Sequence, residues 1–218
     1  AVLGGHAFSQ ITAGKDHTCG LTVDGRVYCW GYNGYDQLGT RGSTTRVPAP
    51  LYSTWGTHVF TAVSAGSQHT CAISSQGFST CWGSDYSGRL GNGRDRHGSN
   101  TPSSDFPVVG NHDFAWIDAA KGAFTCGLTS GGTVLCWGSN LSGQLGIGNT
   151  PPYLYEYPVP IQSALTFAQI STGTDHACAI STRRELYCWG SNGDGRLGIG
   201  FVGSVIPAPT PVAFVSNP

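Results

Sequence analysis

The chain has 218 residues, enough to bury a sizeable core within a single domain. Charged residues make up only 11% of it and the formal net charge is −1, so it carries no electrostatic footprint for nucleic acid or for an anionic membrane. No apolar run approaches the ~20 residues that span a bilayer, and the sequence lacks a signal peptide and any methionine, which is the pattern of a trimmed, secreted chain.

Four repeats account for nearly the whole chain. They begin at Phe8, Phe60, Phe114 and Phe167, so successive repeats start 52, 54 and 53 residues apart. The predicted repeat boundaries are 8–59, 60–113, 114–166 and 167–218. Within each repeat a short apolar strand is followed by a hairpin, a glycine-rich loop, a variable stretch and a strand that begins near a proline. Four short strands per repeat, without sustained helical periodicity, predict an all-β propeller with one blade per repeat.

The hairpin of each repeat is marked by two cysteines ten residues apart, the second followed by Trp-Gly. If Cys19 faces Cys29, then Thr18 faces Trp30, and Gly25 stands in the turn where a left-handed residue is needed. The fourth repeat has Arg184 at this turn position, so its turn must be strained or built differently. Each tryptophan faces a small residue, which favours packing between repeats over stacking on a ligand.

The cysteine spacing predicts one disulfide within each hairpin. Directly opposed residues of antiparallel strands have Cα atoms about 4.5–5.5 Å apart, a separation that a disulfide can span. Free buried thiols and metal ligation are the alternatives, but zinc sites usually have closer cysteine pairs, and two sulfurs per repeat leave tetrahedral coordination incomplete. Disulfides imply an oxidising compartment. The predicted pairs are Cys19–Cys29, Cys71–Cys81, Cys126–Cys136 and Cys178–Cys188.

The fourth strands are expected on the outer edge of each blade, where proline removes no ladder donor. They are predicted around Pro48 and Pro50 and at 107–109, 158–160 and 207–212. Residues 1–7 align with 107–113 and are expected to form a further fourth-strand fragment, with its strand at Ala1-Val2-Leu3. Since a self-closing ring needs only one such strand, three explanations stay open: an excerpt of a longer array, a strand lent to a neighbouring subunit, or a ring closed by two chains.

One pattern runs through the repeats: Ile-x-Ala-Gly-x-x-His-Thr-Cys-x-Leu, then Cys-Trp-Gly-x-Asn-x-x-Gly-Gln-Leu-Gly. It resembles the regulator of chromosome condensation (RCC1) repeat, and most of all the cysteine-bearing extracellular versions in bacterial secreted proteins and Crinkly-type plant receptor ectodomains. The resemblance implies a β-propeller, commonly seven-bladed, whose loops bind other proteins. The founding member exchanges nucleotide on a small GTPase and a bacterial relative inhibits β-lactamase, but neither function carries over, because the contacts lie in variable loops.

The sequence shows no catalytic constellation. Asp16-His17 and Asp175-His176 invite an acid–base interpretation. The histidine, however, recurs in the first, second and fourth repeats, and Phe124 takes its place in the third repeat. We therefore expect the histidines to cap strand ends by hydrogen bonding inside each blade. No nucleophile elbow and no phosphate-cradling loop are present. We predict no cofactor, no metal and no enzyme activity, and a hydrolase ranks third among the functions considered.

Binding is the favoured function, because loops that vary on a fixed frame are where recognition usually resides. The insert 151–158 holds three tyrosines. It is either a polyproline-like connector on the blade edge or a partner surface. Asn140-Leu-Ser is also the one N-glycosylation sequon. The candidate contact residues are Tyr32, Tyr35, Asp36, Asp85, Tyr86, Asn140, Asn192 and Asp194 in the loops, and Tyr153, Tyr155 and Tyr157 in the insert.

Two hypotheses follow from these observations. The first is a secreted propeller that binds a protein or a glycan through its variable loops. The second is a structural subunit of an extracellular assembly, which binds copies of itself by exchanging edge strands, and which the low charge and the doubled end strand suggest.

Overall fold

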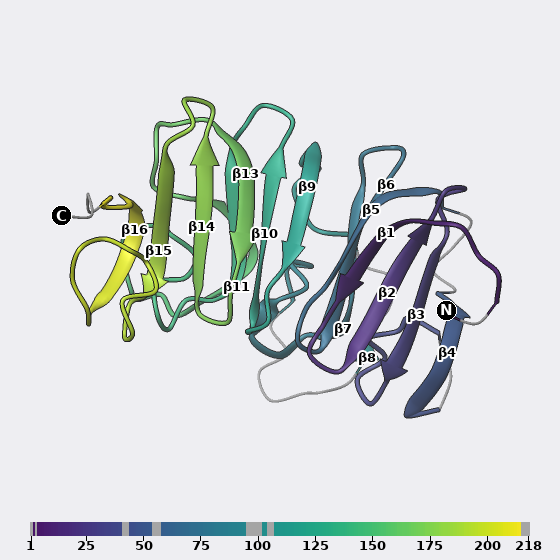
Figure 1. The fold of residues 1–218 in the computed structure, drawn as a ribbon. Coiled ribbons are helices and arrows are strands. Elements are labelled where there is room, and N and C mark those ends of the chain that lie inside the picture. The colour runs from purple at the N-terminus through teal and green to yellow at the C-terminus, as the bar shows by residue number, and fades with distance from the viewer. Residues whose placement is uncertain are drawn as a thin grey trace.

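The four predicted blades are present as four separate antiparallel sheets of four strands each. A computed structural model describes residue 2 and residues 4–40, 44–53, 58–94, 102–103 and 107–214. The sheets follow one another along the chain, with the first and the fourth at opposite ends of the molecule (Figure 1). In every blade the strands lie in chain order, and the first strands of neighbouring blades contact each other, so they form the inner side.

Blade 1 consists of β1 (Phe8–Ala13), β2 (His17–Thr22), β3 (Val27–Tyr32) and β4 (Arg46–Tyr52). Blade 2 consists of β5 (Phe60–Ala65), β6 (His69–Ser74), β7 (Ser79–Ser84), the 3-10 turn η1 (Tyr86–Gly88) and β8 (Pro102–Ser103). Blade 3 consists of β9 (Phe114–Ala119), β10 (Phe124–Thr129), β11 (Val134–Ser139) and β12 (Leu154–Pro160). Blade 4 consists of β13 (Phe167–Thr172), β14 (His176–Ser181), β15 (Leu186–Ser191) and β16 (Val205–Pro211).

The hairpin register predicted from the cysteines is confirmed. In blade 1, Cys19 pairs with Cys29 and Thr18 with Trp30, and the other blades repeat this register. All eight cysteines form the four predicted disulfides, with paired Cα atoms 4.0–4.1 Å apart. The turn glycine of blade 1, Gly25, has φ +80°, and Arg184 takes its place in blade 4 with φ +67°. Blade 4 therefore keeps the same turn and accepts an unfavourable left-handed arginine.

The proline-rich fourth strands form the outer edges, although two of them differ from the prediction. In blade 2 the strand is β8 at Pro102–Ser103, and the expected segment 107–109 contributes a bridge between Thr80 and Pro107. In blade 3 the strand begins at Leu154, so residues 154–157 of the tyrosine-rich insert are strand rather than a polyproline-like connector. The insert pairs with β11 because Leu154 and Tyr155 lie opposite Ser139 and Gly138.

The predicted end strand at residues 1–3 is not formed at Val2, and Ala1 and Leu3 lie outside the described residues. Each described sheet takes its fourth strand from its own repeat. No described blade thus has a vacant place for a strand from another chain, and the structure gives no support to strand exchange.

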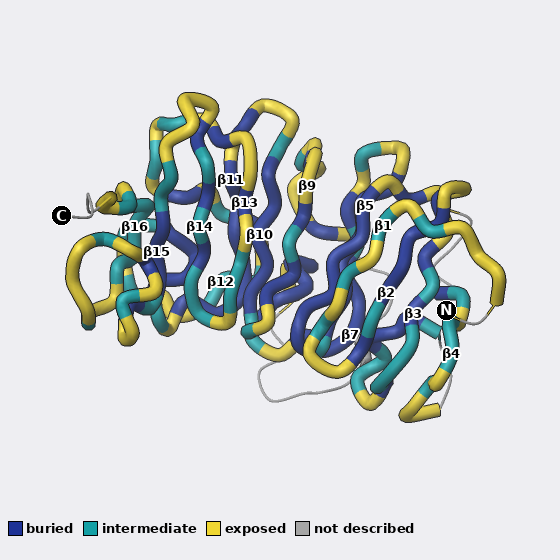
Figure 2. Tube along the Cα trace, viewed as in Figure 1, coloured by how far each residue is buried: buried dark blue, intermediate teal, exposed yellow. Residues whose placement is uncertain are grey.

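The core lies between the blades rather than within them. Between blades 1 and 2, for example, the disulfide Cys19–Cys29 and Leu38 of blade 1 pack in one buried cluster with Val63 and Trp82 of blade 2. Equivalent clusters join blades 2 and 3 and blades 3 and 4. Buried residues accordingly follow the strands, while the hairpin turns are exposed (Figure 2) and much of each glycine-rich loop in blades 1 to 3 is buried. The prediction that the tryptophans pack between repeats is confirmed for Trp82, Trp137 and Trp189, which are fully buried.

Two of the recurring histidines, His17 and His69, join neighbouring blades, and for these two the prediction that they bond inside their own blade is wrong. Nε2 of His17 in blade 1 lies 2.9 Å from Oγ1 of Thr70 in blade 2, and His69 makes the same contact with Thr125 of blade 3. Where Phe124 replaces the histidine, the next blade has Ala177, and both belong to one buried cluster. At this boundary the histidine and its threonine partner in the next blade are therefore both replaced by apolar residues.

A second contact across each boundary involves the tryptophan that follows the second cysteine. Its indole Nε1 donates to a main-chain carbonyl in the glycine-rich loop of the preceding blade: Trp82 to Gln37, Trp137 to Arg89 and Trp189 to Gln144, at 2.9–3.0 Å. Thr70 and Thr125 donate to the Gln37 and Arg89 carbonyls as well. The [Gln/Arg]-Leu-Gly motif therefore supplies the acceptor that holds the next blade.

Candidate binding surfaces

The glycine-rich loops are held by a polar residue at the same position of every repeat, namely Asn33, Asp85, Asn140 or Asn192. In blade 3 the amide of Asn140 donates to the carbonyls of Asn149 and Pro152 at 2.9 and 3.2 Å, and its Oδ1 accepts from the Leu145 amide at 3.2 Å. Asn192 makes the same kind of bonds to Phe201 and Leu197. These side chains satisfy the loop backbone from inside.

Three of the predicted contact residues are therefore structural. Asp85, Asn140 and Asn192 are fully buried, and no ligand on the surface can reach them. Asn140 is also the glycosylation candidate, and since both ends of its amide bond the loop, a glycan there would require the loop to open.

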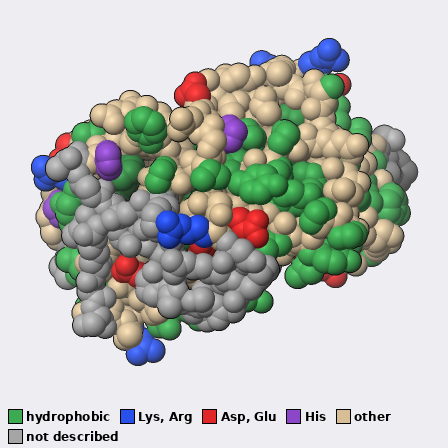
Figure 3. Space-filling view, turned by 180° about the vertical axis from the view of Figure 1, so that it is seen from behind, with side chains coloured by type: hydrophobic (Ala, Val, Ile, Leu, Met, Phe, Trp, Pro, Cys, Tyr) green, Lys and Arg blue, Asp and Glu red, His purple; other side chains and the backbone are tan. Residues whose placement is uncertain are grey.

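Three tyrosines are exposed on blades 2 and 3. Tyr86, Tyr153 and Tyr157 are 48%, 54% and 48% exposed, and we call these three the tyrosine surface. Tyr157 lies on the outer edge strand β12, Tyr153 directly precedes that strand, and Tyr86 belongs to the η1 loop that packs against it. Tyr155 is partly buried against the core, with its ring 6.1 Å from that of Tyr157. On the side opposite to the Figure 1 view, hydrophobic side chains gather and charged ones are few (Figure 3).

Arg89 holds the Tyr86 end of this surface in place. Its Nε donates to the Tyr86 carbonyl at 2.7 Å, its NH1 group donates to Ser67 Oγ at 3.1 Å, and its guanidinium lies 5.8 Å from the Tyr86 ring centre. Burial lowers the pKa of Arg89 to about 10, so the side chain keeps its charge at neutral pH. A fixed, exposed aromatic ring loses little freedom when a partner binds it.

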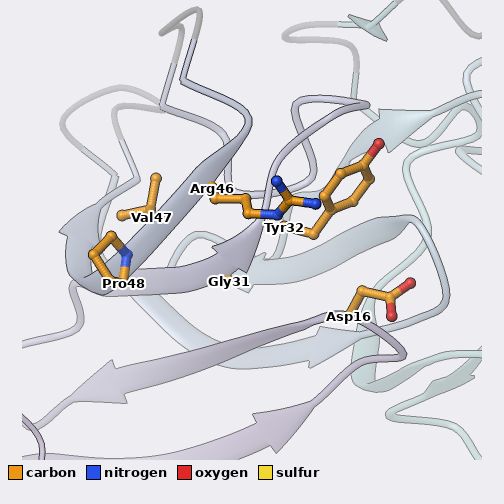
Figure 4. A pocket seen from close by; sticks show the side chains of 6 residues that line it. All are labelled: Asp16, Gly31, Tyr32, Arg46, Val47 and Pro48. Carbon is orange, nitrogen blue, oxygen red and sulfur yellow. The ribbon is translucent and has the colours of Figure 1, made fainter.

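The predicted contact residues of blade 1 lie beside a pocket of about 620 Å³ at the free side of this blade, which is lined by Asp16, Gly31, Tyr32, Arg46, Val47 and Pro48 (Figure 4). The Tyr32 ring lies near Tyr35, with centroids 6.1 Å apart, and Tyr35 and Asp36 are partly exposed.

In blade 4, Asp194 is exposed and pairs with Arg196, which also bonds Asp175 at 2.7 Å. The predicted contact residues of blades 1 and 4 are therefore not part of the tyrosine surface on blades 2 and 3.

A second pocket of blade 1 was not predicted from the sequence. It has a volume of about 590 Å³ and is lined by Asp24, Arg26, Tyr28, Tyr52, His58 and Val59. The rings of Tyr28 and Tyr52 have centroids 5.6 Å apart, and Asp24 and Arg26 form an exposed ion pair at 3.3 Å. The available signal was Tyr28 itself, an aromatic residue at a repeat position that holds Thr80 in blade 2 and Leu135 in blade 3.

Sequence comparison identifies the repeats. Two sequence models of the regulator of chromosome condensation (RCC1) repeat match this chain, one at residues 8–37, 60–89 and 167–196 and the other at 24–73 and 131–180. Together they cover most of it. The chain belongs to the RCC1 repeat family.

Curated and structural relatives agree with this assignment. The ultraviolet-B receptor UVR8 of Arabidopsis thaliana is 30% identical over 198 residues, which are 90% of this chain and 44% of UVR8. Yeast RCC1 bound to Kap60 superposes with a TM-score of 0.82 at 19% identity, over 98% of this chain and 50% of that one. The ectodomain of the receptor kinase CR4 from Physcomitrella patens has a TM-score of 0.56 at 26% identity, over 86% and 42%. This RCC1 chain thus spans about half the length of the relatives it matches.

Inside the RCC1 blades a polar cluster joins the inner strands, and sequence analysis missed it. The Asp118 carboxylate of blade 3 accepts from Ser64 of blade 2 at 3.2 Å and from the Thr172 amide of blade 4 at 2.7 Å, and burial raises its pKa. The Lys121 ammonium donates to the carbonyls of Ala13 and of Ala65, the latter at 2.6 Å. These groups already have partners in the protein, so we assign them to holding the blades together.

The two Asp–His pairs of these RCC1 repeats differ in their surroundings. Burial, with a smaller contribution from the Lys121 charge, lowers the pKa of His17 to about 4, and its Nε2 faces Thr70. His176 is more exposed and has Asp175 at 3.6 Å. Within the described ranges no group of three or more His, Cys, Asp or Glu side chains could hold a metal ion. A helix of sufficient length and hydrophobicity to cross a bilayer is likewise missing from these ranges.

Proposed function

We propose that this RCC1 chain is a non-enzymatic, extracellular binding module that contacts a protein partner through the tyrosine surface. RCC1-type propellers are typically binding or regulatory modules, and their glycine-rich loops leave variable residues exposed on a fixed frame. The observation that supports this proposal most is the presence of Tyr86, Tyr153 and Tyr157 around the single outer strand β12. Tyrosine is enriched in protein interfaces and frequent among the residues that dominate their binding energy.

The proposed location rests on the disulfides. Every cysteine of the chain is in a disulfide within its own blade, and such bonds form and persist outside the reducing cytosol. The likeness to a receptor ectodomain supports the same location.

A protein partner is favoured over a small ligand because the tyrosine surface is an outer strand and a loop rather than a hollow. Yeast RCC1 (Prp20) was crystallised with the protein Kap60, and a second structure of the same protein is described by its binding properties to Gsp1p and histones. We propose the general mode, protein binding, for this chain and none of those partners.

The experiment compares the folded wild-type protein with the variant Tyr86→Ala/Tyr153→Ala/Tyr157→Ala. Extracellular proteins that bind the immobilised wild type are purified, and their affinities for both forms are measured by surface plasmon resonance. We expect at least roughly tenfold weaker binding to the triple variant, because each anchor residue contributes on the order of 1–2 kcal/mol. Phe78→Ala/Val23→Ala removes exposed apolar side chains from the hairpin turns and should bind as the wild type does. Equal affinities for all three forms would rule out the tyrosine surface.

Glycan binding is a second candidate function, favoured by the pocket of Tyr28, Tyr52 and His58 in blade 1. Aromatic faces beside the exposed Asp24–Arg26 pair combine the apolar lining and the polar groups that small-ligand sites use. A glycan array probed with the wild type and with Tyr52→Ala tests it. Signals that disappear in Tyr52→Ala but persist in the triple tyrosine variant would favour this candidate.

A further inference from the structure

The hairpin turn of blade 2 is joined to the next blade differently from the turns of blades 1 and 3. In blade 1 the carbonyl of the turn glycine Gly25 accepts from the amide of Phe60, the first strand residue of the next blade, at 2.8 Å. Blade 3 repeats this bond at 2.8 Å. In blade 2 the equivalent amide, that of Phe114, donates to the His112 carbonyl at 3.1 Å instead. The turn of blade 2 therefore lacks this link to blade 3.

The surroundings of the turn glycine show the space that results. In blades 1 and 3 a Cβ atom added to this glycine would lie 3.0 Å or less from Val59 and from Thr166, respectively. On Gly77 of blade 2 the nearest atom beyond its chain neighbours would be Oδ1 of Asp113, at 3.8 Å. The next blade thus packs against the turn in blades 1 and 3 and stands back from it in blade 2.

A pocket of about 280 Å³ occupies this space. It lies at an internal boundary, because blades 2 and 3 have blades 1 and 4 on either side of them. The hairpin of blade 2 and the start of blade 3 supply most of its lining, which includes Phe78, Ser79, Val108, His112, Asp113 and Phe114.

Ser79 gives this pocket a buried hydroxyl group. The equivalent residues of the other blades are apolar, namely Val27, Val134 and Leu186, and the two valines are 1% exposed inside apolar clusters. Ser79 is 5% exposed, and its Oγ has no hydrogen-bond partner among the described residues. A buried hydroxyl without a partner costs stability. Its presence where a valine would fit favours a role in binding.

Two further side chains of the pocket differ from those of the other blades. Asp113 stands where blades 1 and 3 have the valine and the threonine that pack against the turn. Its Oδ2 accepts from the Ser130 hydroxyl, while its Oδ1 faces the space beside Gly77. Phe78 lines the pocket with its side chain 52% exposed, whereas the equivalent residues are polar in the other three blades.

These groups fit one sugar ring better than other small ligands. The volume lies at the lower end of the roughly 300–1,000 Å³ that small-ligand pockets occupy. A sugar has hydroxyl groups that donate and accept and a face of C–H bonds, which suit a serine hydroxyl, a carboxylate and an aromatic ring. The described lining includes no Lys or Arg, which disfavours an anion. Asp113 is exposed and already bonded to Ser130, so a cation would gain little from it.

We propose that the pocket between the hairpin turn of blade 2 and the first strand of blade 3 binds a single sugar residue of a glycan. Ser79 Oγ and Asp113 Oδ1 bond hydroxyl groups of the ring, and Phe78 covers its apolar face. This site shares no residue with the tyrosine surface or with the blade 1 pocket of Tyr52, so the proposal depends on neither.

The test measures binding of methyl glycosides of glucose, galactose, mannose and N-acetylglucosamine to the full chain, by saturation-transfer NMR titration. We expect at least one of them to bind with a dissociation constant on the order of 1 mM, because so small a ligand has little binding energy. Ser79→Val, Phe78→Thr and Asp113→Thr each introduce the residue that blade 3 has at that position. Each should weaken binding at least roughly tenfold, by removing a hydrogen bond or the aromatic contact.

Ser53→Val is the matched control. Ser53 of blade 1 is 3% exposed, and its Oγ also has no partner among the described residues, but it does not line this pocket. Ser53→Val and Tyr52→Ala should therefore bind the glycoside as the wild type does. Ser79→Val should be at least as stable as the wild type in thermal unfolding, since valine leaves no unsatisfied hydroxyl. A hydroxyl with a purely structural role would instead make this variant less stable.

Four results would overturn the proposal. The first is that no glycoside binds up to its limit of solubility, and the second is that binding is unchanged in all three pocket variants. The third is binding that Tyr52→Ala removes and Ser79→Val keeps, which would assign the sugar to the blade 1 pocket and leave the second candidate function intact. The fourth is binding of choline or n-butylamine, run as cationic probes, without binding of any glycoside.

Discussion

Nε2 of His17 lies 2.9 Å from Oγ1 of Thr70, across the boundary between the first and second blades. The same hydroxyl donates to the Gln37 carbonyl at 2.7 Å, so one threonine ties the histidine to the glycine-rich loop. His69 and Thr125 repeat the arrangement at the next boundary. At the third boundary Phe124 and Ala177 take the two places together, which shows that a polar and an apolar version of the contact exist in one molecule.

The first prediction concerns this pair. His17→Ala should lower the free energy of unfolding by about 2 kcal/mol, since it leaves a cavity and removes a buried hydrogen bond. His17→Phe/Thr70→Ala, which copies the third boundary, should lie within about 1 kcal/mol of the wild type. Urea unfolding followed by tryptophan fluorescence measures both. A double variant as unstable as His17→Ala would show that the two versions of the contact are not interchangeable.

The second prediction is a loss of stability in mild acid. Burial lowers the pKa of His17 to about 4 and that of His69 well below its usual value, with the Lys121 charge contributing to both. In the unfolded chain a histidine takes up a proton near pH 6.5, so the unfolded state binds more protons between about pH 6.5 and 4. Stability is therefore full above pH 6.5 and falls as the pH is lowered through this window, by up to about 3 kcal/mol from His17.

The control for this pH dependence removes the two histidines. In His17→Phe/Thr70→Ala/His69→Phe/Thr125→Ala, the slope of unfolding free energy against pH should largely disappear between pH 6.5 and 5. Asp118 acts in the opposite direction, because its raised pKa means that ionisation at higher pH costs the folded state energy. A wild-type stability that is constant from pH 7.5 to 5 would contradict the neutral, buried state of the histidines.

The third prediction compares two tryptophans at equivalent positions. Trp137→Phe should lower stability by about 2 kcal/mol, because the fully buried indole donates to the Arg89 carbonyl at 2.9 Å. Trp30→Phe should cost less than about 1 kcal/mol in the isolated chain, since Trp30 is half-buried on the free face of blade 1. Thermal unfolding of both variants, measured at a concentration where the chain is monomeric, compares the two losses of stability. Equal losses of stability would contradict the difference in burial between Trp137 and Trp30.

The fourth prediction is a stabilising substitution in the hairpin turn of blade 4. Arg184 has φ +67°, and Gly25, Gly77 and Gly132 hold the same place in the other blades. Arg184→Gly should therefore raise the free energy of unfolding by about 0.5–1 kcal/mol. Its neighbour Arg183 is an exposed turn residue that is not among those with positive φ, so Arg183→Gly should lower stability by a similar amount. A destabilising Arg184→Gly would contradict the assigned turn.

The local features of the fold could be predicted because each is encoded within one repeat. The cysteine spacing determines the register of the hairpin from Thr18–Trp30 to the turn, and the recurrence of the pattern predicts one blade per repeat. The partner of His17 could not be found in this way. Which residue it meets depends on how two sheets pack against each other, and Thr70 lies fifty-three positions further along the chain.

The candidate site was predicted less well, and the repeat pattern explains part of the error. The variable loop predicts a surface position for Asn140, yet Asn33, Asp85 and Asn192 occupy the same loop position. A polar residue kept at one position of every repeat serves the shared frame, and Asn140 is indeed buried in it. Tyr86, Tyr153 and Tyr157 stand at positions without this regularity, and they are exposed.

Each blade is closed by a disulfide of its own, and peptide mapping of the unreduced protein by mass spectrometry tests this most directly. We expect bonds between Cys19 and Cys29, Cys71 and Cys81, Cys126 and Cys136, and Cys178 and Cys188, with no free thiol. Free thiols, or a bond that joins cysteines of different repeats, would contradict the strand register, the interfaces built on it and the proposed extracellular location.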